Sequence, residues 1–227
     1  MEVLNNSNRK ISPDAGGAYG AGWDIMWKTF IPLLLVSIVY FLIGGVSGGF
    51  NMNIEADFHW FMAPLVIFAI AYGVFVSGPI GYSVKWVFLK AVRGEHVEIK
   101  DMFSVFKGNY WNAVLGNILV GIIVFIGILM LIVPGIIFAC RLAFVPYLII
   151  DRDMEVTDAL SKSWEMTKGY GWNIFFMGFL SFWIVILGFL ALFFGVIISA
   201  IWISTSFAAM YQAVVEEEGH FQEAVIE

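Results

Sequence analysis

The sequence predicts an all-α integral membrane protein whose six transmembrane helices form three hairpins. Two long runs predict this fold: residues 174–211 contain no Asp, Glu, Lys, Arg or His over 38 positions, and residues 113–150 contain only Arg141. A helix rises about 1.5 Å per residue and the hydrocarbon core of a bilayer is about 30 Å thick, so each run fits two crossings and a turn. The composition agrees, because 13% of the residues are charged against about 25% in a soluble domain.

Apolar windows of about 19 residues divide the chain into spans at residues 29–48, 61–84, 113–133, 134–150, 174–190 and 193–211. Within the two long runs, Pro134-Gly135 and the segment from Gly188 to Gly195 are the expected turns, since these residues end or bend helices. We treat residues 1–227 as one polytopic membrane domain. It has a flexible N-terminal segment at 1–13 and an acidic cytoplasmic tail at 212–227.

The distribution of basic residues predicts the orientation. Eleven of the 12 Lys and Arg residues fall on one side of these spans, and the first outer loop carries Glu55 and Asp57 instead. By the positive-inside rule the basic side is the cytoplasm, and an even number of crossings puts both termini there. The first 20 residues are polar and do not read as a cleaved secretory signal, so we expect the chain to begin near Met1.

A stretch with helical periodicity precedes each expected hairpin. The apolar faces contain Tyr19, Trp23, Met26, Trp27 and Phe30 in the first stretch, Ile99, Met102, Phe103 and Phe106 in the second, and Val156, Ala159, Leu160 and Trp164 in the third. Each stretch is interpreted as an amphipathic helix in the headgroup region, where Trp and Lys are well accommodated. The alternative is that these faces pack on the cytoplasmic ends of the spans, and the two interpretations are compatible.

The chain contains an internal repeat. A shift of 61 residues superimposes KGNYWN at 107–112 on KGYGWN at 168–173, and 13 of the 44 residues in 107–150 are identical to their counterparts. Chance would give roughly four identities in such a composition. A fainter third copy starts near Trp27, so the expected repeat units are 14–93, 94–151 and 152–215.

Two stretches carry a resemblance to a known family: LIVPGIIFACRLAFVPYLIID at 131–151 and DALSKSWEMTKGYGWNIFF at 158–176. They resemble a broad bacterial family of small polytopic proteins, over roughly residues 95–211. Its members look like the membrane domain ahead of the catalytic barrel in some glycerophosphodiester phosphodiesterases. A barrel of about 250 residues has no counterpart here. The resemblance therefore implies a stand-alone, multi-pass domain of the bacterial inner membrane, without phosphodiesterase activity.

Arg141 is the most unusual residue, because it lies seven positions past Pro134 and hence about 10 Å below the outer surface. A charge within a span costs at least about 2.5 kcal/mol unless it is paired, snorkels or meets water, and the predicted spans contain no Asp or Glu. Candidate partners are carbonyls freed near Pro134 or Pro146, the acids Glu55 and Asp57, or an anion. Arg141 is thus a structural arginine, an anionic lipid or ligand site, or part of a transport path.

Catalytic and metal-binding patterns are missing from the sequence. His59, His96 and His220 are isolated and Cys140 is the single cysteine, so neither a local zinc site nor an Fe-S site is predicted. Ser104 begins an S-x-x-K match that lacks the companion motifs of serine acyl-enzymes. Sparse basic residues interleaved with acids disfavour nucleic-acid binding. We expect no enzymatic activity, no cofactor and no nucleic-acid partner.

The sequence favours a non-enzymatic membrane protein that serves as a scaffold or as a module for binding lipids or proteins. Its expected partners are membrane lipids, anionic phospholipid among them, and a membrane-protein neighbour or a second copy of the chain. The candidate lipid or anion contacts are Arg141, Lys107, Lys168, Lys28, Trp111 and Trp172. The alternative is a small-molecule or ion transporter that uses Arg141, although no helix is expected to break at the midplane.

Overall fold

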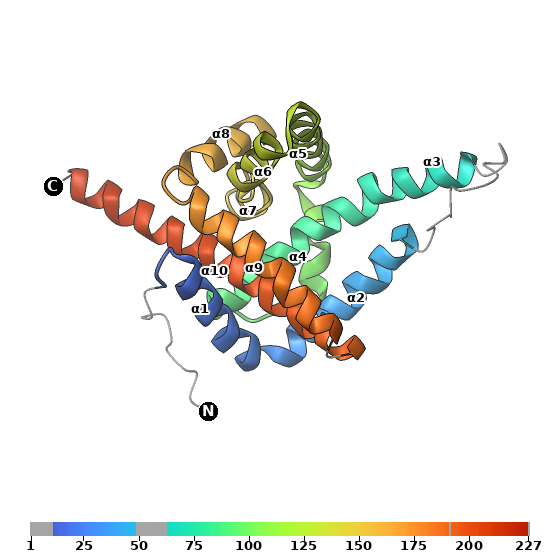
Figure 1. The fold of residues 1–227 in the computed structure, drawn as a ribbon, viewed down its shortest axis with the longest axis horizontal. Helices are drawn as coiled ribbons and strands as arrows, with labels where there is room; N and C mark the ends of the chain where they lie inside the picture. Colours follow the sequence, from blue (N-terminus) through green and yellow to red (C-terminus); the bar gives the residue numbers. More distant parts are fainter. Residues whose placement is uncertain (1–10, 49–62, 191, 227) are drawn as a thin grey trace.

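The computed structural model describes residues 11–48, 63–190 and 192–226, and every regular element in these ranges is a helix (Figure 1). The elements are α1 (Ala15–Lys28), α2 (Phe30–Gly48), α3 (Ala63–Tyr72), η2 (Gly73–Ser77), α4 (Gly78–Val92), η3 (Ile99–Lys107), α5 (Tyr110–Met130), α6 (Ile132–Arg141), α7 (Val145–Asp151), α8 (Val156–Met166), α9 (Gly171–Leu190) and α10 (Leu192–Ile226). Residues 212–226 of the expected tail continue α10 as a helix.

Among the described residues, five helical segments are long and apolar enough to cross a membrane: Val66–Val92, Tyr110–Met130, Ile132–Asp151, Gly171–Leu190 and Gly195–Gly219. A further candidate is the pair Ala15–Lys28 and Phe30–Gly44, which is bent by 96°. Large apolar side chains on these segments point outward, and Phe41, Phe125 and Leu187 are 61–66% exposed. Such surfaces suit lipid rather than water. The chain is a multi-pass membrane protein.

The bend between α1 and α2 falls at Thr29, one residue before the helix that matches the predicted span 29–48. Thr29 leaves the helical conformation, and its hydroxyl donates to the Ile25 carbonyl at 2.8 Å. Pro32 has no amide hydrogen to continue the ladder back to Lys28. The chain therefore turns sharply before the long apolar helix begins.

The second span runs further than its predicted end at residue 84. Residues from α3 through η2 continue into α4, which ends at Val92. η2 is a π-helical turn just before Pro79, whose missing amide cannot bond the Phe75 carbonyl. The Tyr110 hydroxyl donates to that carbonyl at 2.8 Å. The proline thus widens the helix instead of ending it.

The turn expected at Pro134-Gly135 lies earlier, at Leu131, whose backbone is extended. Pro134 occupies the first turn of α6, where a missing amide costs nothing. The predicted span over 134–150 matches the candidate span Ile132–Asp151, in which three turn residues separate the end of α6 at Arg141 from the start of α7 at Val145. Pro146 cannot donate to the Leu142 carbonyl, which accepts the Val145 amide at 3.2 Å instead. The helix of this span is therefore interrupted at residues 142–144.

The amphipathic faces only partly match their predicted composition. η3 is a 3-10 helix in which Met102 is buried while Phe103 and Phe106 are exposed, so these three side chains do not share one face. A period of three residues separates positions that an α-helical period would align. In α1, similarly, Met26 is buried and Trp23 is exposed.

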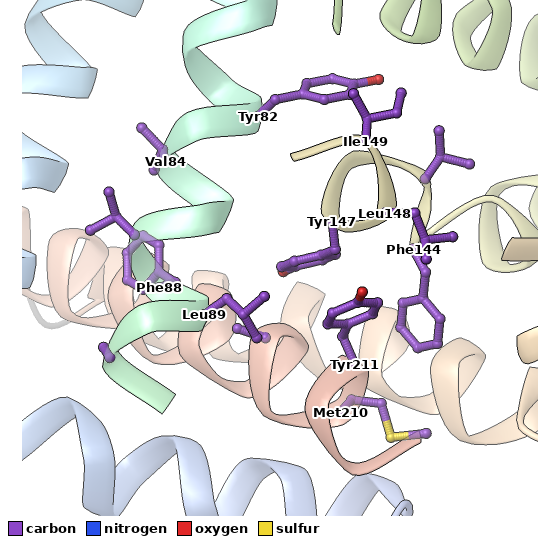
Figure 2. Close-up of a cluster of buried hydrophobic side chains, with 14 of the residues drawn as sticks. Tyr82, Val84, Phe88, Leu89, Phe144, Tyr147, Leu148, Ile149, Met210 and Tyr211 are labelled. Atoms are coloured by element: carbon purple, nitrogen blue, oxygen red, sulfur yellow. The ribbon is translucent and has the colours of Figure 1, made fainter. Parts of the chain in front are cut away.

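The core lies where α4, α7 and α10 meet (Figure 2). Tyr147 of α7 stacks on Tyr211 of α10 with ring centroids 4.9 Å apart. Just beyond α4, Arg93 binds both carboxylate oxygens of Asp151, at 2.5 and 2.8 Å, and donates to Gln212 at 2.8 Å. Burial lowers the pKa of Arg93, but its pairing with Asp151 raises the pKa more. This bidentate pair joins the three helices at one end of the core.

Candidate functional site

The candidate site is a cavity of about 560 Å³ between α6 and the start of α9. Its lining residues are Val133, Ile136, Ile137, Cys140, Arg141, Gly169, Gly171, Trp172 and Phe175. Three of these, Val133, Ile137 and Trp172, are 48–72% exposed, so the cavity reaches the outer surface of the helix bundle. Arg141 is the one charged residue that lines it.

The backbone of Arg141 is fixed to α8. Its carbonyl accepts hydrogen bonds from Ser163 at 2.8 Å and from Thr167 at 3.3 Å, and both hydroxyl side chains are fully buried. α6 ends at Arg141, so this carbonyl has no helical continuation to accept from. These bonds use the backbone of Arg141 and leave its side chain to the cavity.

The guanidinium of Arg141 makes few contacts with the protein. Its Cζ lies 5.6 Å from the centroid of the Trp164 ring, and its Nη1 atom is buried without a hydrogen-bond partner. No Asp or Glu of the described residues forms an ion pair with Arg141. A cation–π contact contributes about 0.5–2 kcal/mol, whereas a charge at the centre of a span costs about 2.5–3.5 kcal/mol. The Nη2 atom lies toward the cavity, since a Cβ placed on Gly171 would lie 4.0 Å from it.

The N-terminus of α9 adds positive potential to the same place. Gly169 has a φ of +90°, a conformation that favours glycine, and it allows the tight turn before α9. The first bond of α9 runs from the Ile174 amide to the Tyr170 carbonyl, so the amides of residues 171–173 precede the helical ladder. A Cβ placed on Gly171 would lie 3.9 Å from Arg141 Cζ. The guanidinium therefore lies beside the positive end of the α9 dipole.

Of the residues predicted from the sequence, Arg141 and Trp172 line this cavity together. Lys168 is exposed in the turn next to Gly169. The remaining three, Lys28, Lys107 and Trp111, are exposed and line neither this cavity nor the second one.

The predicted depth of Arg141 does not agree with its neighbours. The six-span topology placed Arg141 near the outer surface and residues 168–173 on the opposite side, yet Arg141 lies against Gly171. α6 has only ten residues, and the chain turns directly after it. The suggested partners Glu55 and Asp57 lie outside the described residues.

Sequence reasoning missed Trp164 and Gly171 as site residues. Trp164 was assigned to an amphipathic face, and its ring in fact lies near Arg141. The GYG sequence at 169–171, directly before a long apolar run, was the available signal for a helix N-terminus without a large side chain. Nothing in the sequence paired that turn with residue 141.

The second cavity of the described chain has no polar lining, and no metal site is found among the described residues. This second cavity of about 480 Å³ between α3, η2 and α5 is lined entirely by apolar residues, from Ile67 to Ile118. Among residues 11–48, 63–190 and 192–226, no group of three or more His, Cys, Asp or Glu could hold a metal ion. The Arg141 cavity is therefore the cavity of the described residues that is lined by a charged side chain.

Comparisons with protein-family models, curated proteins and solved structures found no match to this chain.

Proposed function

We propose that this protein is a non-enzymatic, multi-pass protein of the bacterial inner membrane that acts as a scaffold by binding membrane lipids, anionic phospholipid in particular. The observation that carries the proposal is the Arg141 cavity, in which a guanidinium without a carboxylate partner among the described residues lies beside the N-terminus of α9. Both groups attract anions. A membrane-protein neighbour or a second copy of the chain would then assemble around the bound lipid.

A second set of residues supports lipid binding at headgroup level. Lys28 ends α1, Lys107 ends η3, and Lys168 follows α8, so each exposed lysine stands just before a long apolar helix. Trp111 and Trp172, which are 66% and 72% exposed, lie at the start of two of these long helices. Lys and Trp in such positions interact with lipid headgroups.

These junctions also support a finer architecture. We propose three repeat units, each an amphipathic helix at the interface followed by a hairpin, with both termini in the cytoplasm. α1, η3 and α8 would be the interfacial helices. In this arrangement the three lysines face the same anionic leaflet.

The test measures lipid selectivity of the whole chain. Replacing Lys28, Lys107 and Lys168 together by Glu should at least halve the enrichment of phosphatidylglycerol over phosphatidylcholine in nanodiscs, because each charge reversal repels anionic headgroups. The matched control replaces the same three residues by Arg and keeps the charge. Unchanged enrichment in the Glu variant would count against binding at these junctions.

A specific observation favours a transporter as the second candidate. The helix of the span Ile132–Asp151 is interrupted at residues 142–144, and ion sites of secondary transporters use interrupted helices. Anion flux into proteoliposomes that disappears in Arg141→Ala would favour transport over scaffolding. Absence of flux, with lipid still bound, would favour the scaffold.

A further inference from the structure

The Arg141 cavity has a cationic end and an apolar end. Arg141 and the first turn of α9 form the cationic end, where Gly169 and Gly171 leave room beside the guanidinium. The lining of α6 then continues back to Val133, eight residues earlier and about 12 Å away along a helix. Apart from Arg141, this lining is apolar or formed by glycine, tryptophan and cysteine.

We propose that this cavity binds one anionic phospholipid, with the phosphate at Arg141 and one acyl chain along α6. The inference rests on the proposed function and deepens it, because it assigns a single lipid molecule to a single site. The phosphate would accept hydrogen bonds from the guanidinium, whose Nη2 lies on the Gly171 side of the cavity, and from the open amides of residues 171–173. The acyl chain would lie against Ile136, Ile137 and Phe175.

Phosphate fits the cationic end for two reasons. Arginine binds phosphate through two parallel N–H donors, and a helix N-terminus presents further N–H groups with a favourable dipole. No carboxylate of the described residues competes for the guanidinium. The nearest aromatic partner, Trp164, contacts the guanidinium at a centroid distance of 5.6 Å and leaves Nη1 unbonded.

The apolar end decides between a lipid and a small soluble anion. A cavity of about 560 Å³ lies within the range of about 300–1,000 Å³ that small-molecule sites occupy, and a phosphate ion alone would leave the α6 side of it empty. Val133 and Ile137 on that side are exposed at the surface of the span. An acyl chain could therefore enter from the bilayer without crossing a polar barrier.

The experiment titrates the full-length protein in a non-ionic detergent with dioleoyl phosphatidylglycerol, with dioleoyl phosphatidylcholine and with inorganic phosphate, read by native mass spectrometry. The wild type should bind one phosphatidylglycerol tightly and phosphatidylcholine more weakly, since the choline cation is repelled by Arg141. Arg141→Gln should weaken phosphatidylglycerol binding at least about tenfold. Arg141→Lys should retain part of it, because the charge stays but the two-donor geometry is lost.

A cavity-filling pair keeps the proposal testable if Arg141→Gln does not fold. Gly171→Leu adds a side chain next to Arg141 and leaves its charge in place, so it should also abolish the single tight lipid. Gly178→Leu is the matched control, because it makes the same change on an exposed position of α9 with open space around it. It should bind phosphatidylglycerol like the wild type.

The outcomes separate this proposal from the broader one. Equal phosphatidylglycerol binding by the wild type, Arg141→Gln and Gly171→Leu would overturn the single-lipid site. Displacement of the lipid by inorganic phosphate at equal concentration would assign the site to a free anion and overturn the lipid part. Reversal of Lys28 and Lys107 to Glu, neither of which lines the cavity, should leave the one tight lipid in place. If it abolished that lipid and Arg141→Gln did not, the junctions and not the cavity would be the binding site.

Discussion

Asp101 lies outside the membrane-spanning helices, and its ionised carboxylate stabilises the fold. Its carboxylate accepts from Lys90 at 2.9 Å and from the Glu98 amide at 3.1 Å, so it joins η3 to α4. Burial raises the pKa of Asp101, but the bonds from Lys90 and Glu98 lower it more, and the net pKa is below the usual value. The ionised form therefore stabilises the fold.

We expect Asp101→Asn to lower the free energy of unfolding by about 1 kcal/mol at pH 7, since a charge-assisted bond becomes a neutral one at a partly exposed site. A lowered carboxylate pKa contributes stability above the unfolded value of about 3.9 and loses it as the pH falls through the folded value. The difference between wild type and variant should therefore stay constant from pH 7 to about pH 5, shrink below the unfolded pKa of about 3.9 and disappear only below the lowered folded pKa. Thermal unfolding in detergent at these pH values measures it.

The control for this titration is Asp158→Asn, because Asp158 is exposed and its side chain makes no hydrogen bond with the described residues. At pH 7 it should cost no more than Asp101→Asn, because an exposed carboxylate in the first turn of α8 loses only its interaction with the helix dipole. A wild-type advantage over Asp101→Asn that persisted undiminished at pH 3 would contradict the assignment.

The sequence could identify Arg141 but not the site around it. A single charge in a long apolar run is visible in the sequence alone, and so is the need for a partner. The neighbours Trp164 and Gly171 belong to other helices, and their approach depends on where α6 ends. Periodicity within one segment carries no information about that contact.

The close contact between helices α5 and α6 requires a glycine. A Cβ on Gly127 would lie 2.9 Å from Gly135 Cα and 2.6 Å from the Phe138 ring. Gly188 is 61 residues later in the sequence, and a Cβ there would meet the backbone of Gly195 in α10 at 2.8 Å. Both pairs of long helices therefore approach each other through a glycine at the corresponding position.

We expect Gly127→Ala to lower the free energy of unfolding by about 1–3 kcal/mol, because the added methyl group forces α5 and α6 apart. Gly121→Ala is the matched control in the same helix, where a Cβ meets nothing within 4 Å. It should leave the stability unchanged or raise it by up to about 1 kcal/mol, since alanine favours the helix. Thermal unfolding of both variants in the same detergent measures the two effects. Equal effects would show that α5 and α6 are not in close contact at Gly127.

At the scale of the helices, the sequence predicts where helices occur but not where they are interrupted. Each predicted span contains a helix, because long apolar runs are a strong signal. A proline usually interrupts a helix, and Pro79, Pro134 and Pro146 all lie in the predicted spans. Pro79 follows the π-helical turn η2 inside a continuous span, and Pro134 lies in the first turn of α6. Of these three, only Pro146 lies next to an interruption, between α6 and α7. Whether a proline interrupts the helix depends on which group donates to the carbonyl that the proline leaves without its amide partner, as the Tyr110 hydroxyl does for the Phe75 carbonyl. Tertiary contacts supply that group.

The order of helix contacts describes the molecule as a whole. α4 packs on η3 and α5, α6 packs on α9 and α7 on α8, and α10 returns to α1 (Figure 1). At the last contact a Cβ on Gly22 would meet the Ser206 backbone at 2.9 Å, and Trp202 donates to the Tyr19 carbonyl at 3.0 Å. The later helix of each proposed repeat unit thus contacts the beginning of the next unit, and the third unit contacts the first. α10 also packs on α4, and α4 on α7, so helices of all three proposed units meet in one core.

One common orientation predicts that Lys28, Lys107 and Lys168 lie on the same face of the membrane, which the proposed topology makes cytoplasmic. The single native cysteine allows a direct measurement after Cys140→Ser. Cysteines placed one at a time at 28, 107 and 168 should all react with an impermeant maleimide in inside-out vesicles and stay unreactive in right-side-out vesicles. A cysteine at position 55 should show the opposite pattern, because an odd number of crossings separates it from each lysine. Labelling of any one lysine position from the other face would break the shared orientation and the repeat proposal with it.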